Sequence, residues 1–257
     1  SEFVQRHGRI AWLRHGIGHL WLSRFTQGAI AISSRIRNEY EARGIPNLLV
    51  PALLNWKFRE TVEQERRRNR EGEVPSVPTF AYVGSDKPED GLDNLLKGSA
   101  LALQGGLRHN IKLIGPRDRL HAAVDLARTS LEIAGNNNLS VVGVLTEDEY
   151  VRILRTCDGV ILPRPKCPTN DANFPTRLPE FLLVGAPTVI GESGDVKHYL
   201  RDGNDAILLQ TSTPEEIKAV LISLAESPLT RHRMRDEGPL TAERYFTVQA
   251  HVSAFRA

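Results

Sequence analysis

Cysteine is scarce in this sequence, because Cys157 and Cys167 are the only two in 257 residues. They do not stand at the spacing of a metal-binding motif, and no cluster of cysteines and histidines surrounds them, so we expect no metal site. Two thiols in a chain of this length are typical of a reducing compartment, and we expect a cytoplasmic protein. The simplest interpretation is one buried small side chain and one loop thiol.

Long hydrophobic runs are also missing, since no apolar stretch reaches the roughly 18 residues that span a bilayer. Residues 10–25 are partly apolar, but arginines and histidines interrupt them. Their apolar side chains fall near helical spacing, which leaves two interpretations open. One is a helix packed on a core, and the other is a helix lying in the interface of an anionic membrane. The second would place the protein at the inner face of the membrane, as a peripheral contact.

The sequence also has no large excess of positive or negative charge. Lysine and arginine number 33 against 31 for aspartate and glutamate, which gives a net charge of +2. This balance argues against a dedicated nucleic-acid binder, so we expect no nucleic-acid partner. A mixed charge run at residues 63–71 has no apolar stripe, and its glutamates neutralise its arginines. We interpret residues 56–75 as a charged linker or an exposed helix.

What the sequence does have, from Thr79 onward, is a regular alternation of strand and helix patterns. Thr146 begins one helix with a capping box to Glu149, and Thr213 with Pro214 opens another. The repetition predicts an α/β fold: a Rossmann-like parallel sheet with helices on both faces, which binds ligands at the carboxyl ends of its strands. Strands are predicted at 79–83, 111–114, 139–142, 159–162, 188–190 and 206–209, and further helices at 92–103, 120–133, 178–184 and 241–255.

The first part of the chain carries a shorter version of this pattern. Residues 28–33 predict a buried strand, residues 34–43 a helix that stops at Gly44, and residues 47–51 another strand. The chain therefore enters in the middle of a β-α-β pattern. We expect that a domain beginning with its last two strands has lost its earlier ones.

The loop after the predicted strand 79–83 holds the first candidate binding residues. Gly84 lets the backbone approach a ligand closely, and Ser85 and Lys87 could donate hydrogen bonds to a phosphate ahead of a helix N-terminus. An ordinary turn is the alternative interpretation of this loop.

The second candidate loop, residues 170–176, runs into a helix whose first turn holds Arg177 and Glu180. The two side chains are three residues apart, so they lie near one face of the helix. Arg177 can make a bidentate contact with a diphosphate, and Glu180 can accept hydrogen bonds from both vicinal hydroxyls of a ribose. A surface ion pair at the start of a helix is the alternative.

Residues 174–181 read Phe-Pro-Thr-Arg-Leu-Pro-Glu-Phe, and residues 185–187 read Gly-Ala-Pro. This segment resembles the donor-binding motif of retaining GT-B glycosyltransferases of the family 4 type. A common form of that motif is Pro-x-Lys-Leu-x-Glu-Tyr, followed by Gly-x-Pro-Val. The resemblance covers nearly the whole chain, but only about the last two thirds of such an enzyme. Further segments agree in order: 31–33 and 49–52 at the end of the acceptor domain, 80–85 at the opening of the donor domain, 141–150 beside the base, and 157–163 in the next strand.

The resemblance implies a domain organisation. Residues 1–55 would be the trailing part of the N-terminal acceptor domain, and residues 56–75 the linker. Residues 76–245 would be the nucleotide-sugar donor-binding domain, and residues 246–257 a C-terminal helix that crosses back. Acceptor recognition and any catalytic base would lie in a largely missing N-terminal half, to which neither His15 nor His19 can be assigned. We therefore expect this chain alone to bind a nucleoside diphosphate without turnover.

The resemblance also implies an activity. It is the transfer of a sugar from a nucleoside diphosphate sugar to the hydroxyl of a glycan or lipid-linked acceptor, with anomeric retention, in glycan or polysaccharide biosynthesis. No metal and no cofactor are implied, and the catalytic residues are not identified. The implied donor-binding residues are Gly84, Ser85, Lys87, Gly143, Asn173, Phe174, Pro175, Thr176, Arg177 and Glu180.

The sequence departs from the family's pattern in the groups that would hold the donor. The earlier of two glutamates common in the donor loop falls on Ala172, and the adjacent Asp171 is a candidate substitute. The arginine and lysine common in the glycine-rich loop are Ser85 and Asp90, while Arg177 replaces the usual lysine. Two alternatives therefore stay open. One is a non-catalytic nucleotide-sugar-binding module, and the other is a GT-B nucleotide-sugar epimerase.

Overall fold

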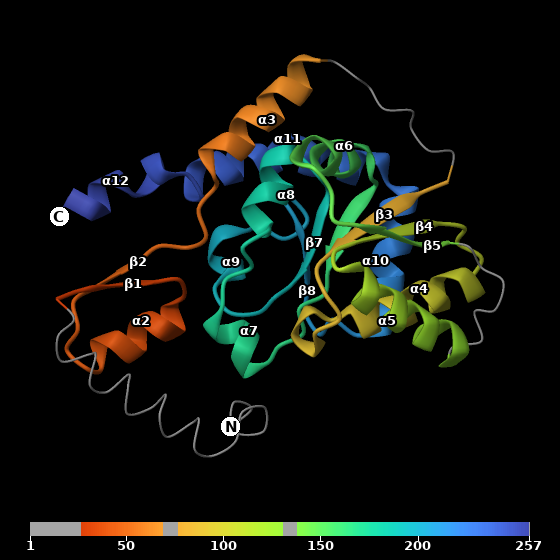
Figure 1. Ribbon diagram of the computed structural model, residues 1–257, viewed down its shortest axis with the longest axis horizontal. Coiled ribbons are helices and arrows are strands. Elements are labelled where there is room, and N and C mark those ends of the chain that lie inside the picture. The colour runs from red at the N-terminus through yellow and green to blue at the C-terminus, as the bar shows by residue number, and fades with distance from the viewer. Residues whose placement is uncertain (1–26, 69–76, 131–137, 257) are drawn as a thin grey trace.

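The computed structural model describes residues 27–68, 77–130 and 138–256. The partly apolar segment 10–25, with His15 and His19, lies outside these residues, and so does the charge run from residue 69 onward. Within the described residues, six strands form one parallel sheet and two more form a separate parallel pair (Figure 1).

The six-stranded sheet confirms the predicted fold class. Its strands lie in the order β5-β4-β3-β6-β7-β8, and every neighbouring pair is parallel. All residues of β3 and β6 are buried, as expected of strands that are covered on both faces. The strands are β3 Thr79–Val83, β4 Asn110–Ile114, β5 Leu139–Gly143, β6 Gly159–Leu162, β7 Thr188–Gly191 and β8 Ile207–Leu209.

Two groups of helices cover the sheet (Figure 1). Helices α4 Leu92–Gln104, α5 Arg117–Ser130 and α10 Pro214–Glu226 pack together on one face, while α6 Glu147–Thr156, α8 Leu178–Val184 and α11 Pro228–Tyr245 pack on the other. The chain runs outward from β3 to β5 and then returns to β6 on the other side of β3. The strand order therefore reverses between β3 and β6, the kind of place where open α/β sheets bind ligands.

The helix starts predicted from capping residues are confirmed. The Thr146 hydroxyl accepts the Glu149 amide, and the Glu149 carboxylate accepts the Thr146 amide at 2.9 Å, which completes the capping box. Thr213 caps α10 in the same way, with Pro214 at the first helical position. These caps determine the residues at which α6 begins after β5 and α10 begins after β8.

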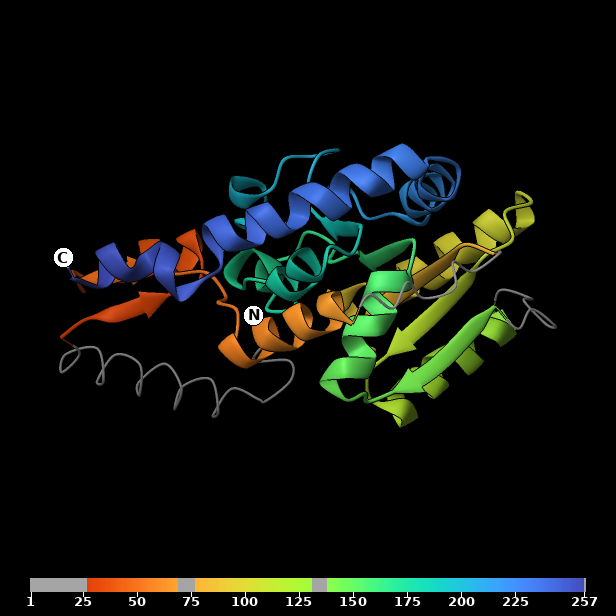
Figure 2. The ribbon, with the colours of Figure 1, turned by 90° about the horizontal axis from the view of Figure 1, so that it is seen from above.

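The first described elements form a unit beside the main sheet. Strand β1 Ala29–Ala31 pairs with β2 Asn47–Leu49, and α2 Ser34–Glu41 connects them, so the predicted β-α-β pattern is present with shorter strands. The Ser33 hydroxyl caps α2 and donates to the Ala172 carbonyl at 2.7 Å. The last helix, α12 Val248–Arg256, lies on the same side of the molecule as this unit (Figures 1 and 2).

The first half of the expected charged linker is a packed helix, α3 Trp56–Arg67. Phe58 and Val62 are one turn apart and buried, and the helix contacts α6 and α8. The backbone carbonyl of Glu65, whose side chain is also buried, accepts a hydrogen bond from Arg155 at 2.6 Å. The sequence predicted a linker or an exposed helix here, and the structure shows a helix that packs on the main domain through side chains just before the charge run.

The single helix predicted at 241–255 was also wrong. Helix α11 ends at Tyr245, and α12 begins at Val248. Between them, the buried Phe246 uses its carbonyl to accept the Leu54 amide at 2.7 Å, and the Thr247 hydroxyl accepts the Ala250 amide at 3.3 Å. The break therefore ties the crossover after β2 to the end of the main domain.

Short helical turns after the strands were not predicted. They are η2 Pro88–Asp90, α7 Pro168–Ala172 and α9 Val196–Tyr199.

Cys167 stands in the loop before α7, and Cys157 is buried, so the interpretation of one loop thiol and one buried thiol is confirmed. Burial raises the pKa of the Cys157 thiol to about 12. No helix in the described part of the chain is long and apolar enough to cross a membrane.

Helices α4 and α10 cross at close range beside Gly98. A Cβ atom on Gly98 would stand 2.7 Å from Cγ2 of Ile217 and 2.9 Å from the Pro214 carbonyl oxygen. Only a residue without a side chain permits this approach. Gly98 therefore sets the distance between the two helices that cover β3 and β4.

Replacement of Gly98 by alanine should lower the free energy of unfolding by about 1–3 kcal/mol, because the added methyl group overpacks the crossing. Urea denaturation followed by circular dichroism measures this change. Gly105→Ala at the end of the same helix is the control, since its nearest atoms would lie at an ordinary 3.4 Å. Helix propensity alone favours alanine, so an unchanged or increased stability of Gly98→Ala would contradict the close crossing.

Candidate functional site

A pocket with a volume of about 460 Å³ opens at the carboxyl ends of β3, β4 and β5, beside the first turn of α8. We call it the β3–β5 pocket. Five of the residues predicted to bind a ligand line it together: Gly84, Ser85, Gly143, Arg177 and Glu180. The remaining lining residues are Asn55, Phe58, Val83, Asp90, Ile114, Gly115, Pro116, Val144, Leu145, Glu147 and Tyr150.

Backbone contacts between three strand ends form one wall of the β3–β5 pocket. The Gly84 amide donates to the Ile114 carbonyl at 3.1 Å, and the Gly115 amide donates to the Gly143 carbonyl at 3.2 Å. A Cβ atom on Gly115 would stand 2.0 Å from the Gly84 carbonyl oxygen, so no side chain fits there. Gly143 has a φ of +90°, which other residues rarely adopt. The glycines therefore hold three backbone turns together at the mouth of the sheet.

Arg177, Glu180 and Tyr150 form a hydrogen-bonded cluster on another side of the pocket. Arg177 Nη1 donates to Glu180 Oε2 at 3.0 Å, and the Tyr150 hydroxyl donates to the same oxygen at 3.1 Å. The Arg177 guanidinium also lies over the Tyr150 ring, 5.6 Å from its centroid. Burial, and then the neighbouring Glu180 carboxylate, raise the pKa of Tyr150 well above its ordinary value. The i,i+3 pair weighed from the sequence is present, and it lines a pocket.

The glycine-rich loop after β3 differs in detail from the expectation. The Ser85 hydroxyl donates to Asp90 Oδ2 at 3.0 Å, and the Tyr82 hydroxyl donates to the Ser85 carbonyl at 2.6 Å. Lys87 is exposed and does not line the pocket. The loop is therefore fixed by its own contacts, and the side chain that it turns to the pocket beside Ser85 is a carboxylate.

The predicted run from Asn173 to Thr176 is divided between core and surface. Phe174 and Pro175 are buried, and the Phe174 ring packs against Tyr199 at 5.4 Å and Phe246 at 5.6 Å between centroids. Asn173 and Thr176 are exposed. None of the four lines the β3–β5 pocket, so their assignment to a ligand stays a prediction.

Comparison with protein-family models gives one match, to glycosyl transferases group 1, over residues 63–241. This region holds the whole six-stranded sheet and the β3–β5 pocket except Asn55 and Phe58. The chain belongs to the glycosyl transferases group 1 family. None of the curated proteins matches the chain significantly.

Solved glycosyltransferase structures share the fold of this chain at low sequence identity. Alr3699/HepE from Anabaena, in complex with UDP and glucose, is 16% identical with a TM-score of 0.66, and the match covers 91% of this chain and 63% of that one. Sucrose-phosphate synthase from Thermosynechococcus elongatus is 13% identical with a TM-score of 0.68, over 91% of this chain and 58% of that one. The chain thus spans about three fifths of the length of these proteins.

A third structure is itself a single domain. The C-terminal domain of the group 1 glycosyltransferase LpcC from Francisella tularensis is 13% identical with a TM-score of 0.55. The match covers 77% of this chain and 97% of that domain. The larger part of this chain therefore has the fold of a glycosyltransferase C-terminal domain.

The charged residues that line the β3–β5 pocket are mostly acidic. Three of them are acidic: Asp90, Glu147 and Glu180. The one cation among them is Arg177, and it forms an ion pair with Glu180. Arg117 lies close by, where its Nη2 donates to the Val142 carbonyl at 3.1 Å. An anionic ligand in this pocket would therefore depend on backbone amides and on few cations.

Several lining residues were missing from the prediction because tertiary structure brings them in. Phe58 comes from α3, which the sequence did not indicate as a packed helix, and Tyr150 lies 30 residues before Glu180. The capping box at Thr146 was a usable signal, because it places Glu147 and Tyr150 in the first turns of α6 above β5. Asp171, the candidate substitute for the family's first glutamate, does not line this pocket.

Proposed function

We propose that the chain is the donor-binding part of a glycosyltransferase that moves a sugar from a nucleoside diphosphate sugar to an acceptor hydroxyl. The β3–β5 pocket is assigned to the nucleoside diphosphate. Membership of the family supports the reaction class. The UDP in the Anabaena Alr3699/HepE structure supports the choice of a nucleotide as ligand.

The observation that carries the proposal is the geometry of Glu180. Both hydrogen bonds to its carboxylate go to Oε2, and within the described residues no hydrogen bond reaches Oε1. The side chain is 24% exposed, so Oε1 can meet a ligand in the pocket. A carboxylate held at one oxygen and open at the other is suited to accept the vicinal hydroxyls of a ribose.

The remaining parts of the donor follow from this placement. The base lies toward Gly143 and Val144 at the end of β5, and the diphosphate lies toward Gly84 and Arg177. Arg177 is 55% exposed, so its guanidinium can keep one bond to Glu180 while it donates to a phosphate oxygen. The glycine turns let backbone amides approach the diphosphate, where they would stabilise the departing charge.

Two finer features belong to the proposal. Retention of the anomeric configuration rests on the resemblance of residues 174–181 to the donor motif of retaining enzymes. The acceptor is a glycan or a lipid-linked glycan, and the reaction belongs to glycan or polysaccharide biosynthesis. Catalytic groups and most of the acceptor recognition are assigned to the part of such an enzyme that precedes the donor domain.

Glu180→Gln should abolish most of the discrimination between a ribonucleotide and its 2′-deoxy analogue. Calorimetric titration with UDP, GDP and dTDP first identifies the preferred base. Loss of one hydrogen bond to a charged group costs about 1.5–3 kcal/mol, so the wild type should prefer the ribonucleotide by roughly tenfold or more. The amide in the variant keeps the size of the side chain but removes its charge.

The matched control is Glu147→Gln, which removes the charge of another lining glutamate and should keep the ribose preference. If Glu180→Gln discriminates as strongly as the wild type, the ribose is recognised elsewhere. If none of the three nucleoside diphosphates binds the wild type, the assignment of this pocket fails.

Asp90→Asn should strengthen UDP binding, since it removes a carboxylate from the part of the pocket assigned to the diphosphate. The gain should be about 1 kcal/mol, the energy of two unit charges a few ångström apart in water, or roughly fivefold in affinity. Asp93→Asn is the control, because Asp93 lies nearby on α4 but is exposed and paired with Lys97 at 2.6 Å. Unchanged or weaker UDP binding by Asp90→Asn would place the diphosphate away from this loop.

A further inference from the structure

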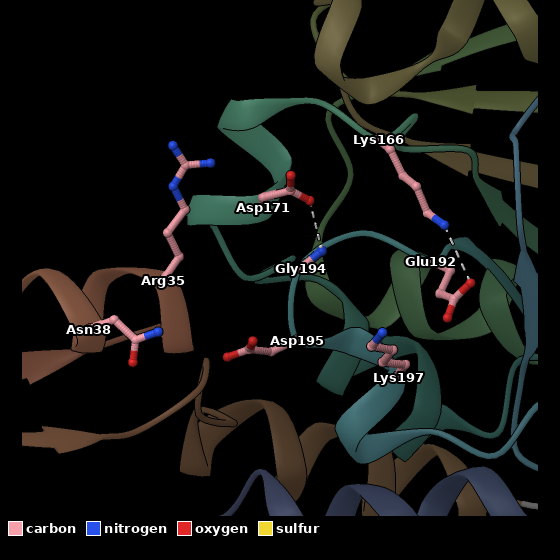
Figure 3. Close-up of a pocket in the computed structure, with 8 residues that line it drawn as sticks. All are labelled: Arg35, Asn38, Lys166, Asp171, Glu192, Gly194, Asp195 and Lys197. Atoms are coloured by element: carbon pink, nitrogen blue, oxygen red, sulfur yellow. Dashed lines mark hydrogen bonds and ion pairs between the residues drawn. The ribbon is translucent and has the colours of Figure 1, made fainter.

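A second pocket, with a volume of about 450 Å³, opens at the carboxyl ends of β6 and β7 against α2 (Figure 3). We call it the β6–β7 pocket. It lies at the same edge of the sheet as the β3–β5 pocket, but the two have no lining residue in common. Its lining residues are Arg35, Asn38, Lys166, Asp171, Glu192, Gly194, Asp195 and Lys197.

The carboxylates of the β6–β7 pocket already have donors. Asp171 Oδ1 accepts the Gly194 amide at 3.2 Å, and Asp195 Oδ2 accepts the Ser34 amide at 2.5 Å. Glu192 pairs with Lys166 at 3.5 Å. The acidic side chains therefore hold the walls of the pocket together: one fixes the loop after β7 to α7, and another fixes that loop to the start of α2.

Two cations of the pocket lack such partners. Among the described residues, no carboxylate lies within ion-pair distance of Arg35 or Lys197, and the hydrogen bond from Arg35 to the Pro168 carbonyl is long, at 3.4 Å. Arg35 comes from α2 and Lys197 from α9, on either side of the Gly194–Asp195 turn (Figure 3). The lining thus holds three cations and three carboxylates, and Arg35 and Lys197 are the two cations that no carboxylate of the described residues pairs.

Polar groups next to the lining residues are also unsatisfied. Ser193 stands between Glu192 and Gly194 and is only 2% exposed, yet its hydroxyl has no hydrogen-bond partner among the described residues. Asn170, beside Asp171, is 1% exposed, and its Oδ1 has no partner there either. Buried polar groups normally find partners, so these two atoms leave the loops behind the pocket incompletely hydrogen-bonded. Neither residue lines the pocket, so a ligand would meet Arg35 and Lys197 rather than these atoms.

We propose that the β6–β7 pocket binds an oxyanion of the acceptor substrate, a phosphate or a carboxylate group, through Arg35 and Lys197. Because an acceptor is a partner of the transfer reaction, the inference rests on the proposed function. The neighbouring position of the two pockets along one sheet edge allows donor and acceptor to be bound at the same time. Arg35 and Lys197 come from opposite sides, so an anion between them would also hold α2 against the main domain.

Ligand-observed NMR titrations test this proposal with three probes: glucose 6-phosphate, glucuronate and neutral glucose. Each is measured in the presence of saturating UDP, which occupies the β3–β5 pocket. The wild type should bind at least one charged sugar at least fivefold more tightly than glucose, and the better probe distinguishes a phosphate from a carboxylate. Arg35→Gln and Lys197→Gln should each remove most of this preference.

The matched controls are Arg43→Gln and Lys97→Gln, which remove charges of the same kind outside the pocket and should keep the preference. Equal binding of the three sugars, or equal losses in the control variants, would overturn the proposal. UDP affinity is measured on every variant, because neither Arg35 nor Lys197 lines the β3–β5 pocket. Failure of UDP, GDP and dTDP alike to bind the wild type would instead overturn the proposed function, and with it the acceptor assignment.

Discussion

The close approach of the backbone at Gly84 and Gly115 is the constraint on which the β3–β5 pocket depends. A Cβ atom on Gly115 would collide with the Gly84 carbonyl oxygen, so the ends of β3 and β4 meet only because Gly115 has no side chain. The Gly115 amide then reaches the Gly143 carbonyl and joins the end of β5 to the same assembly. Three turns that would otherwise diverge become one wall beside the point where the strand order reverses.

The charge distribution around the β3–β5 pocket depends on the backbone amides of this wall and on the side chains that line the rest of the pocket. Backbone amides provide fixed donors, while the side chains around the pocket are mostly acidic, and the one lining cation, Arg177, is shared with Glu180. Tyr150 adds a donor that stays protonated because burial and the adjacent carboxylate raise its pKa. Glu180 is thereby oriented by two donors on one oxygen. Its other oxygen is left for a ligand, and this is the oxygen to which the proposed ribose hydroxyls would donate.

The sequence was sufficient where local chemistry decides the structure. Uniform apolar runs predicted the parallel strands, and Thr146 and Thr213 marked the starts of α6 and α10 because their hydroxyls cap helices without help from distant residues. The pattern at 174–181 also identified Arg177 and Glu180, which do line a pocket.

Other features could not be predicted because they depend on contacts between distant segments. Helix α3 is mostly charged, and Phe58 and Val62 are its only buried apolar side chains. The break between α11 and α12 exists because the Phe246 carbonyl accepts an amide from Leu54, far away in the sequence. Phe174 belongs to the core for the same reason, since its ring partners come from α9 and the end of α11.

Hydrogen–deuterium exchange with and without saturating UDP tests the central claim most directly, because it locates the nucleotide on the whole chain at once. The account predicts slower exchange at residues 84–91, 114–117, 143–147 and 176–181, with unchanged exchange in α10. Protection confined to residues 192–197, with those four segments unchanged, would contradict the assignment of the nucleotide to the β3–β5 pocket.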